Sequence, residues 1–141
     1  MPGSKSDYLE ALVLDLLIGA VASGWTRPAG LNTLYIAAFP VAPSDAGGGT
    51  EISTGGGSNY GRVAVTNNDT YWGRTDNQAE NLSDISFPTA LTDWGTVVAI
   101  GIFDAATSGN LLWWCTLATS KEVLTNDILV ITAGDLVITE D

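Results

Sequence analysis

Residues 96–117, with the sequence TVVAIGIFDAATSGNLLWWCTL, predict a β-hairpin and with it the fold class of the chain. Two apolar runs, 96–103 and 110–117, flank a segment of turn-forming residues, Asp104 to Asn110. Short apolar runs rich in β-branched and aromatic residues are typical of strands. Gly109 can take the positive φ that a closing bulge requires. We therefore expect two antiparallel strands joined by a short loop.

The rest of the chain after residue 30 shows the same strand-like pattern. Five further strands are predicted where the period is two or the apolar runs are short, at 33–39, 60–66, 82–87, 128–132 and 135–139. Seven short strands with turn signals between them predict a mainly β chain, built as a single antiparallel β-sandwich. Two glycine-rich stretches, 46–49 and 54–59, have little side-chain mass to pack, so we expect a mobile surface loop there.

One α-helix is predicted before these strands, at residues 7–20. Asp7 and Glu10 stand where an N-cap and its reciprocal partner would, and Gly19 and Gly24 end the helix. Apolar residues recur at offsets of three and four: Leu9, Leu12, Val13, Leu16 and Leu17. The opposite face is apolar too, with Tyr8, Ala11, Leu14 and Ile18.

A helix that is apolar all round requires burial all round. It either lies under its own sheet or is clamped between neighbouring subunits, and we favour the second alternative. A membrane helix is disfavoured because the stretch is short and Asp15 lies in its middle. The predicted organisation is an N-terminal helical arm, 1–24, and a β-sandwich domain, 25–141, with an assembly interface on Leu9, Leu12, Val13, Leu16 and Leu17.

The composition of the 141 residues indicates a subunit of an assembly. Hydrophobic residues make up 45% of the chain and charged residues 15%, so few charges remain to cover the surface. We expect a homo-oligomer, with a trimer as the favoured number; the alternative is a compact monomer covered by Gly, Ser, Thr and Asn. The net charge of −11 and the five scattered basic residues argue against nucleic-acid and anionic-membrane partners.

The residue inventory argues against catalysis. The chain has no histidine, which removes the commonest general base and metal ligand, and it has one cysteine, Cys115, in an apolar run. No cofactor and no transition metal are expected. Asp93 and Asp104 could in principle act as a carboxylate pair, but both lie in turn-like contexts. Calcium bound by loop oxygens, and sugar stacked on the five tryptophans, are the alternatives that the composition leaves open.

A series of short motifs resembles a known family. Their order is Leu9-Glu10-Ala11-Leu12, Ala42-Pro43-Ser44-Asp45-Ala46-Gly47, Gly49-Thr50-Glu51, Tyr60-Gly61-Arg62, Phe87-Pro88-Thr89-Ala90, Asp93-Trp94-Gly95-Thr96, Phe103-Asp104-Ala105, Gly109-Asn110-Leu111-Leu112 and Ala133-Gly134-Asp135-Leu136. This string, from about residue 6 to 141, resembles small tailed-bacteriophage virion proteins that are often described as tail-fibre or minor structural proteins. The chain departs from the family pattern at 67–81, a polar segment whose Tyr71, Trp72 and Arg74 we interpret as a possible recognition loop.

The resemblance implies a non-enzymatic structural protein, made in the host cytoplasm and located in the virion. Its partners would be other virion proteins, either the major capsid protein or tail proteins. Within this class a capsid decoration, or cement, protein is our preferred interpretation, because a small acidic β-sandwich with an apolar helix suits a capsomer junction. The alternatives are a tail or tail-fibre protein that contacts the host surface and a lectin-like binding module.

Overall fold

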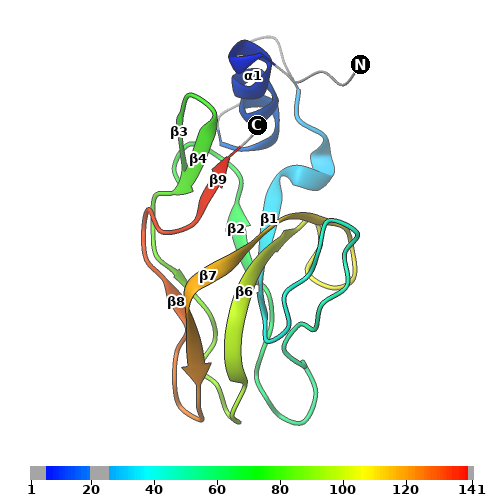
Figure 1. Ribbon diagram of the computed structural model, residues 1–141, viewed down its shortest axis with the longest axis vertical. Helices are drawn as coiled ribbons and strands as arrows, with labels where there is room; N and C mark the ends of the chain where they lie inside the picture. The colour runs from blue at the N-terminus through cyan, green and yellow to red at the C-terminus, as the bar shows by residue number, and fades with distance from the viewer. Residues whose placement is uncertain (1–5, 20–25, 140–141) are drawn as a thin grey trace. The chain divides into compact units, whose positions relative to one another are not determined.

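The computed structural model describes residues 6–19 and 26–139, and in these ranges the chain is mainly β with one short α-helix (Figure 1). The helix, α1, spans Asp7–Leu17, and a 3-10 turn, η1, spans Ala29–Leu31. The strands of the same ranges are β1 (Thr33–Phe39), β2 (Val63–Thr66), β3 (Trp72–Thr75), β4 (Gln78–Asn81), β5 (Ile85–Ser86), β6 (Gly95–Phe103), β7 (Leu111–Val123), β8 (Val130–Ile131) and β9 (Val137–Thr139). The sheets are antiparallel and sandwich-like, which confirms the predicted fold class.

The chain divides into two compact units. The first, which we call the helix unit, comprises residues 1–33, 66–85 and 131–141, and the second, the hairpin unit, comprises 34–65 and 86–130. The predicted boundary between a helical arm and a β-sandwich falls at residue 24, outside the described residues, so that division stays a prediction.

The hairpin unit is built around the predicted hairpin. Strands β6 and β7 pair antiparallel and belong to a four-stranded sheet of order β2-β1-β6-β7. Gly109 has φ +72°, as the closing loop requires, and a Cβ atom there would lie 2.5 Å from a carboxylate oxygen of Asp104. Strand β7 runs six residues beyond the predicted end at 117, because the register shifts between Val97 and Ala99 and the pairing then resumes at Lys121.

An aromatic cluster fills part of the hairpin unit. The rings of Tyr60, Phe87 and Trp94 lie 5.3–6.5 Å apart between centroids, and Tyr60 meets Trp94 edge-on. The Trp94 indole donates a hydrogen bond of 2.8 Å to the carbonyl of Ser58. These contacts place the end of the long segment between β1 and β2 inside the unit.

The segment between the two glycine-rich stretches packs more closely than the sequence suggested. Ile52 is 6% exposed, and its amide donates a hydrogen bond of 3.1 Å to the carbonyl of Ala38 in β1. Thr50 and Val41 exchange two further backbone hydrogen bonds. Residues 50–53, between the two glycine-rich stretches, are thus held against β1 by one buried apolar side chain and backbone hydrogen bonds, and the mobility expected for 46–49 and 54–59 stays a prediction.

The helix unit contains two strands that the sequence did not predict. Strands β3 and β4 form a sheet of order β3-β4-β9 and occupy most of the segment 67–81, which was expected to be a polar loop. Trp72 and Ala79, each 1% exposed, supply its core side chains. Four-residue strands with one or two apolar residues carry too little periodicity to be recognised.

Helix α1 begins at the predicted residue, Asp7, and ends three residues earlier than predicted, at Leu17. Its N-cap is Ser6, whose hydroxyl accepts a hydrogen bond of 3.4 Å from the amide of Leu9, in place of the predicted Asp7. The chain becomes extended at Ile18, and Gly19 takes φ +77°.

Two side chains bind the backbone around the end of α1. Asn67, 4% exposed, donates to the carbonyls of Leu17 and Leu31 at 2.7 Å each, and its side-chain oxygen accepts from the amide of Gly19 at 2.8 Å. Arg27 donates to the carbonyls of Leu16, Gly19 and Asn67. Because the last carbonyls of a helix have no partners inside it, these bonds fix the C-terminal end of α1 in the helix unit.

Candidate functional site

The two faces of α1 have different surroundings. Leu14 and Ile18 are fully buried, so this face supplies the packing of α1 within the helix unit. On the other face Leu9 is 43% exposed, and the remaining predicted interface residues are half-buried: Leu12, Val13, Leu16 and Leu17. The structure therefore leaves the predicted interface side partly open to a partner.

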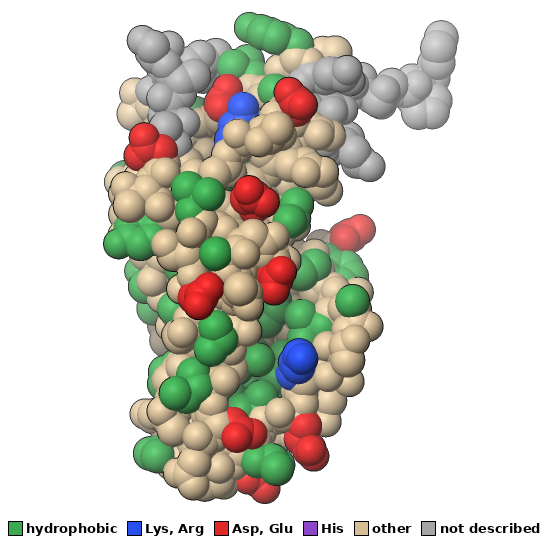
Figure 2. Space-filling view, turned by 90° about the vertical axis from the view of Figure 1, so that its left-hand side faces the viewer, with side chains coloured by type: hydrophobic (Ala, Val, Ile, Leu, Met, Phe, Trp, Pro, Cys, Tyr) green, Lys and Arg blue, Asp and Glu red, His purple; other side chains and the backbone are tan. Residues whose placement is uncertain are grey.

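Tyr8 is far more exposed than its grouping in the sequence suggested. It was grouped with Leu14 and Ile18, but its side chain is 77% exposed. Since Tyr8 lies in the first turn, it extends beyond the buried part of that face. Hydrophobic side chains are visible at the α1 end in Figure 2, and we define the outer face of α1 as Tyr8, Leu9, Leu12, Val13, Leu16 and Leu17.

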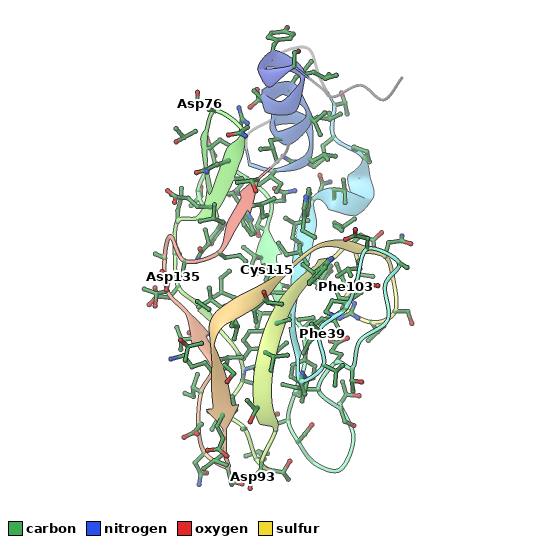
Figure 3. The ribbon with its side chains drawn as sticks, viewed as in Figure 1. Phe39, Asp76, Asp93, Phe103, Cys115 and Asp135 are labelled. Carbon is green, nitrogen blue, oxygen red and sulfur yellow. The ribbon has the colours of Figure 1, made fainter. Side chains whose placement is uncertain are left out.

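Asp15 lies within α1 and forms an ion pair with strand β3. Its carboxylate lies 2.7 Å from the Arg74 Nε, and both side chains are partly exposed. Arg74 also donates a hydrogen bond of 2.8 Å to the carbonyl of Asp76, which lies at the turn between β3 and β4 (Figure 3). Charge pairing thus accounts for the acidic residue in the middle of an otherwise apolar helix.

The three residues of the predicted recognition loop are not brought together on one exposed surface. Trp72 is 1% exposed and belongs to the core of the helix unit, and its indole N–H has no hydrogen-bond partner in the described part of the chain. Arg74 is engaged with Asp15. Tyr71 alone is well exposed, at 40%. Tyr71 lies in the turn before β3, whereas Trp72 is the first residue of the strand and contributes to the core of the helix unit.

A second arrangement, centred on Arg62 in the hairpin unit, was not predicted. The Arg62 guanidinium binds Glu51 through two hydrogen bonds, 2.9 Å from Nε and 2.8 Å from Nη2. Its Nη1 donates to the carbonyls of Ala105 and Ser108 at 2.8 Å each. The guanidinium carbon also lies 3.6 Å from the centre of the Phe103 ring, a cation–π contact.

Tyr60 completes this arrangement, which we call the Arg62 network. Its hydroxyl donates to Glu51 Oε1 at 2.8 Å and accepts from the amide of Ala38 at 3.0 Å. Burial raises the pKa of Tyr60, and the neighbouring Glu51 charge adds to the increase. Tyr60 is therefore a neutral hydrogen-bond donor at physiological pH. The network joins residues of three motifs that were quoted for the family resemblance, but no short-range sequence signal connects them.

Asp93 and Asp104 do not form a carboxylate pair. They flank opposite ends of β6, whose nine residues span roughly 30 Å, whereas paired catalytic carboxylates lie within about 10 Å. Asp104 accepts hydrogen bonds from the Asn110 side chain and amide, and Asp93 accepts from the Thr125 hydroxyl and amide. These bonds lower the pKa of both carboxyls. Both residues act in turns.

The described residues offer little for metal or thiol chemistry. Among residues 6–19 and 26–139, no cluster of three or more His, Cys, Asp or Glu side chains is arranged to hold a metal ion. Cys115 is half-buried, and desolvation raises the pKa of its thiol. In the same ranges, no helix has the length and hydrophobicity needed to span a membrane.

Comparison with known families finds a match that covers nearly the whole chain. A family model described as "Podophage GP4 fiber I protein gp80" matches residues 4–139. The chain belongs to this family. As a member of the fiber I family it is a phage virion structural protein, located in the virion and associated with other virion proteins. This finding confirms the resemblance seen in the sequence. No curated protein matches the chain.

Proposed function

We propose that this fiber I family protein is a non-enzymatic structural component of a phage fibre, and that it assembles through the outer face of α1. The family match over residues 4–139 carries the proposal, because its description names a fibre. The same description favours a fibre over the capsid decoration role that the sequence analysis preferred.

The composition of the outer face of α1 supports an assembly role. Tyr8 and Leu9 are exposed while the adjoining apolar side chains of that face are half-buried, so a partner would remove a continuous apolar stripe from water. Burying one large apolar side chain completely in the interface contributes about 1.5–3 kcal/mol to the free energy of association. A second copy of this chain is the partner we favour, in a closed oligomer such as the trimer expected from the composition.

The absence of catalysis is part of the proposal. The 141 residues include no histidine, and the two carboxylates that could have formed a pair hold turns at opposite ends of β6. The Glu51 carboxylate is held in place by three hydrogen bonds from Arg62 and Tyr60.

A recognition role for the segment 67–81 is retained for Tyr71 only. This side chain is 40% exposed next to Leu82, which is 46% exposed and whose amide donates to the Tyr71 carbonyl at 2.8 Å. An exposed aromatic beside an exposed aliphatic residue is a suitable surface for a host or virion protein.

The assembly role is tested by Leu9→Asp in phage carrying the variant. Leu9 is 43% exposed, so a carboxylate there leaves folding intact but disfavours burial in an interface. We expect the variant to fold and to be depleted from purified particles, as measured by quantitative mass spectrometry. Leu91→Asp, at a 57% exposed site of the hairpin unit, is the matched control and should be incorporated normally.

Two outcomes would contradict the proposal. Normal incorporation of the Leu9→Asp protein would show that the outer face of α1 is not the assembly surface. A wild-type copy number that matches the capsid subunits instead of the fibres would place the protein in the shell.

A further inference from the structure

A groove of about 570 Å³ opens beside the Arg62 network in the hairpin unit. One wall is formed by residues 51–54 and the other by residues 106–108, while Tyr60, Gly61 and Arg62 lie between them. The volume is within the range of small-molecule sites, about 300–1,000 Å³. The groove does not include any residue of the outer face of α1.

The Arg62 network leaves a hydrogen-bond acceptor and a donor unused on neighbouring atoms. Glu51 Oε1 accepts two hydrogen bonds, whereas Oε2 accepts one, from Arg62 Nη2 at 2.8 Å. Of the five N–H bonds of Arg62, four have acceptors among the described residues, and the remaining one is on Nη2. A carboxylate oxygen with a free lone pair thus lies beside a nitrogen with a free N–H.

This pair is held rigidly, which suits recognition. The Arg62 side chain is 7% exposed and is fixed by four hydrogen bonds and by the Phe103 ring. Glu51 is more accessible, with 25% of its side chain exposed. Because both groups are already ordered, a ligand would lose little additional side-chain entropy on binding.

The charges and side chains of the groove define the ligand class. An anion is disfavoured because Glu51 neutralises Arg62 and the chain carries a net charge of −11. A cation is also disfavoured, because the one carboxylate that lines the groove is already paired. Hydroxyl side chains complete the walls, at Ser53, Thr54, Thr107 and Ser108. The lining therefore suits a neutral ligand with many hydroxyl groups.

We propose that this groove binds a neutral saccharide, with two adjacent hydroxyls of one sugar ring on Glu51 and Arg62. One hydroxyl donates to Glu51 Oε2 while its neighbour accepts from Arg62 Nη2, which is the pattern that a vicinal diol offers. The hydroxyls of Thr54 and Thr107 rotate to serve further sugar oxygens as donors or acceptors. Binding at this groove is independent of the assembly role of α1.

The test is a titration of the isotope-labelled chain, followed by amide chemical shifts. The probes are the methyl glycosides of glucose, galactose, mannose and rhamnose, with methyl glucuronide as the charged comparison. We expect saturable shifts at residues 53–54 and 106–108 with at least one neutral glycoside, and weaker binding of the glucuronide. Thr107→Tyr, at an exposed site, should fill the groove and raise the Kd at least about tenfold.

The control is Thr119→Tyr, which adds the same ring at an exposed position of β7 outside the groove and should leave the Kd unchanged. The absence of saturable shifts with all four neutral glycosides would overturn the proposal. So would preferred binding of the glucuronide, or a Kd that Thr107→Tyr and Thr119→Tyr change equally.

Discussion

Replacing Asn67 with alanine should release the C-terminal end of α1. The Asn67 side chain makes three hydrogen bonds to the backbone, with Leu17, Gly19 and Leu31, at 2.7–2.8 Å. Each intramolecular hydrogen bond contributes about 1 kcal/mol net, and a buried group left without a partner costs about 1–3 kcal/mol. We therefore expect Asn67→Ala to lower the free energy of unfolding by about 3 kcal/mol.

The effect is measured by urea unfolding, followed by tryptophan fluorescence and far-ultraviolet circular dichroism. For a domain of this size, 3 kcal/mol corresponds to a decrease in Tm of roughly 10 °C. Hydrogen exchange adds a local readout, because the α1 amides should lose protection more than the amides of β6. The matched control is Asn32→Ala, at an exposed asparagine, which should change the free energy by less than about 0.5 kcal/mol.

The reasoning is refuted if Asn67→Ala and Asn32→Ala are equally stable, or if α1 keeps its protection in the Asn67 variant. Either result would show that α1 is held without its capping side chain. The face containing Leu14 and Ile18 would then have to account for its position.

Two further predictions follow from burial and charge. Trp72→Ala should cost about 3–5 kcal/mol in unfolding free energy because the ring is 1% exposed, whereas Tyr71→Ala should cost less than about 1 kcal/mol; equal losses in chemical unfolding would contradict this assignment. Asp104→Ala should be less stable than wild type near neutral pH, because hydrogen bonds from Asn110 lower the pKa of Asp104 below its ordinary value of 3.8. A carboxyl group whose pKa is lowered by folding stabilises the folded state at pH values above its ordinary pKa, and this stabilisation is lost as the pH falls through its pKa in the folded protein. The difference in stability between wild type and Asp104→Ala should therefore shrink below about pH 4. A difference that is constant with pH would show that the Asp104 charge is not involved.

The strands that could be predicted are those with apolar runs. Strand β1 matches its predicted bounds, and the hairpin of β6 and β7 was found because its two runs are interrupted by turn residues with Gly109 at the positive φ. Strands β3 and β4 were missed because most of their side chains are polar. Their core side chains, Trp72 and Ala79, resemble isolated loop residues when the partner strand is unknown.

The candidate sites depended on contacts that are distant in sequence. The spacing of apolar residues in α1 predicted Leu9 as an interface residue, which stays a prediction, and helical periodicity alone did not show which face the protein itself buries. The Arg62 network joins Glu51 to a loop more than fifty residues away, at Ala105 and Ser108. Arginine and glutamate separated by loops give no local pattern, so only the fold could bring them together.

The central claim, that the outer face of α1 is covered in the virion, is tested most directly by hydroxyl-radical footprinting of Tyr8. This side chain is 77% exposed in the free chain and should be oxidised readily there. In intact purified particles we predict that Tyr8 is strongly protected. Equal oxidation of Tyr8 in the free chain and in the particles would contradict assembly through α1.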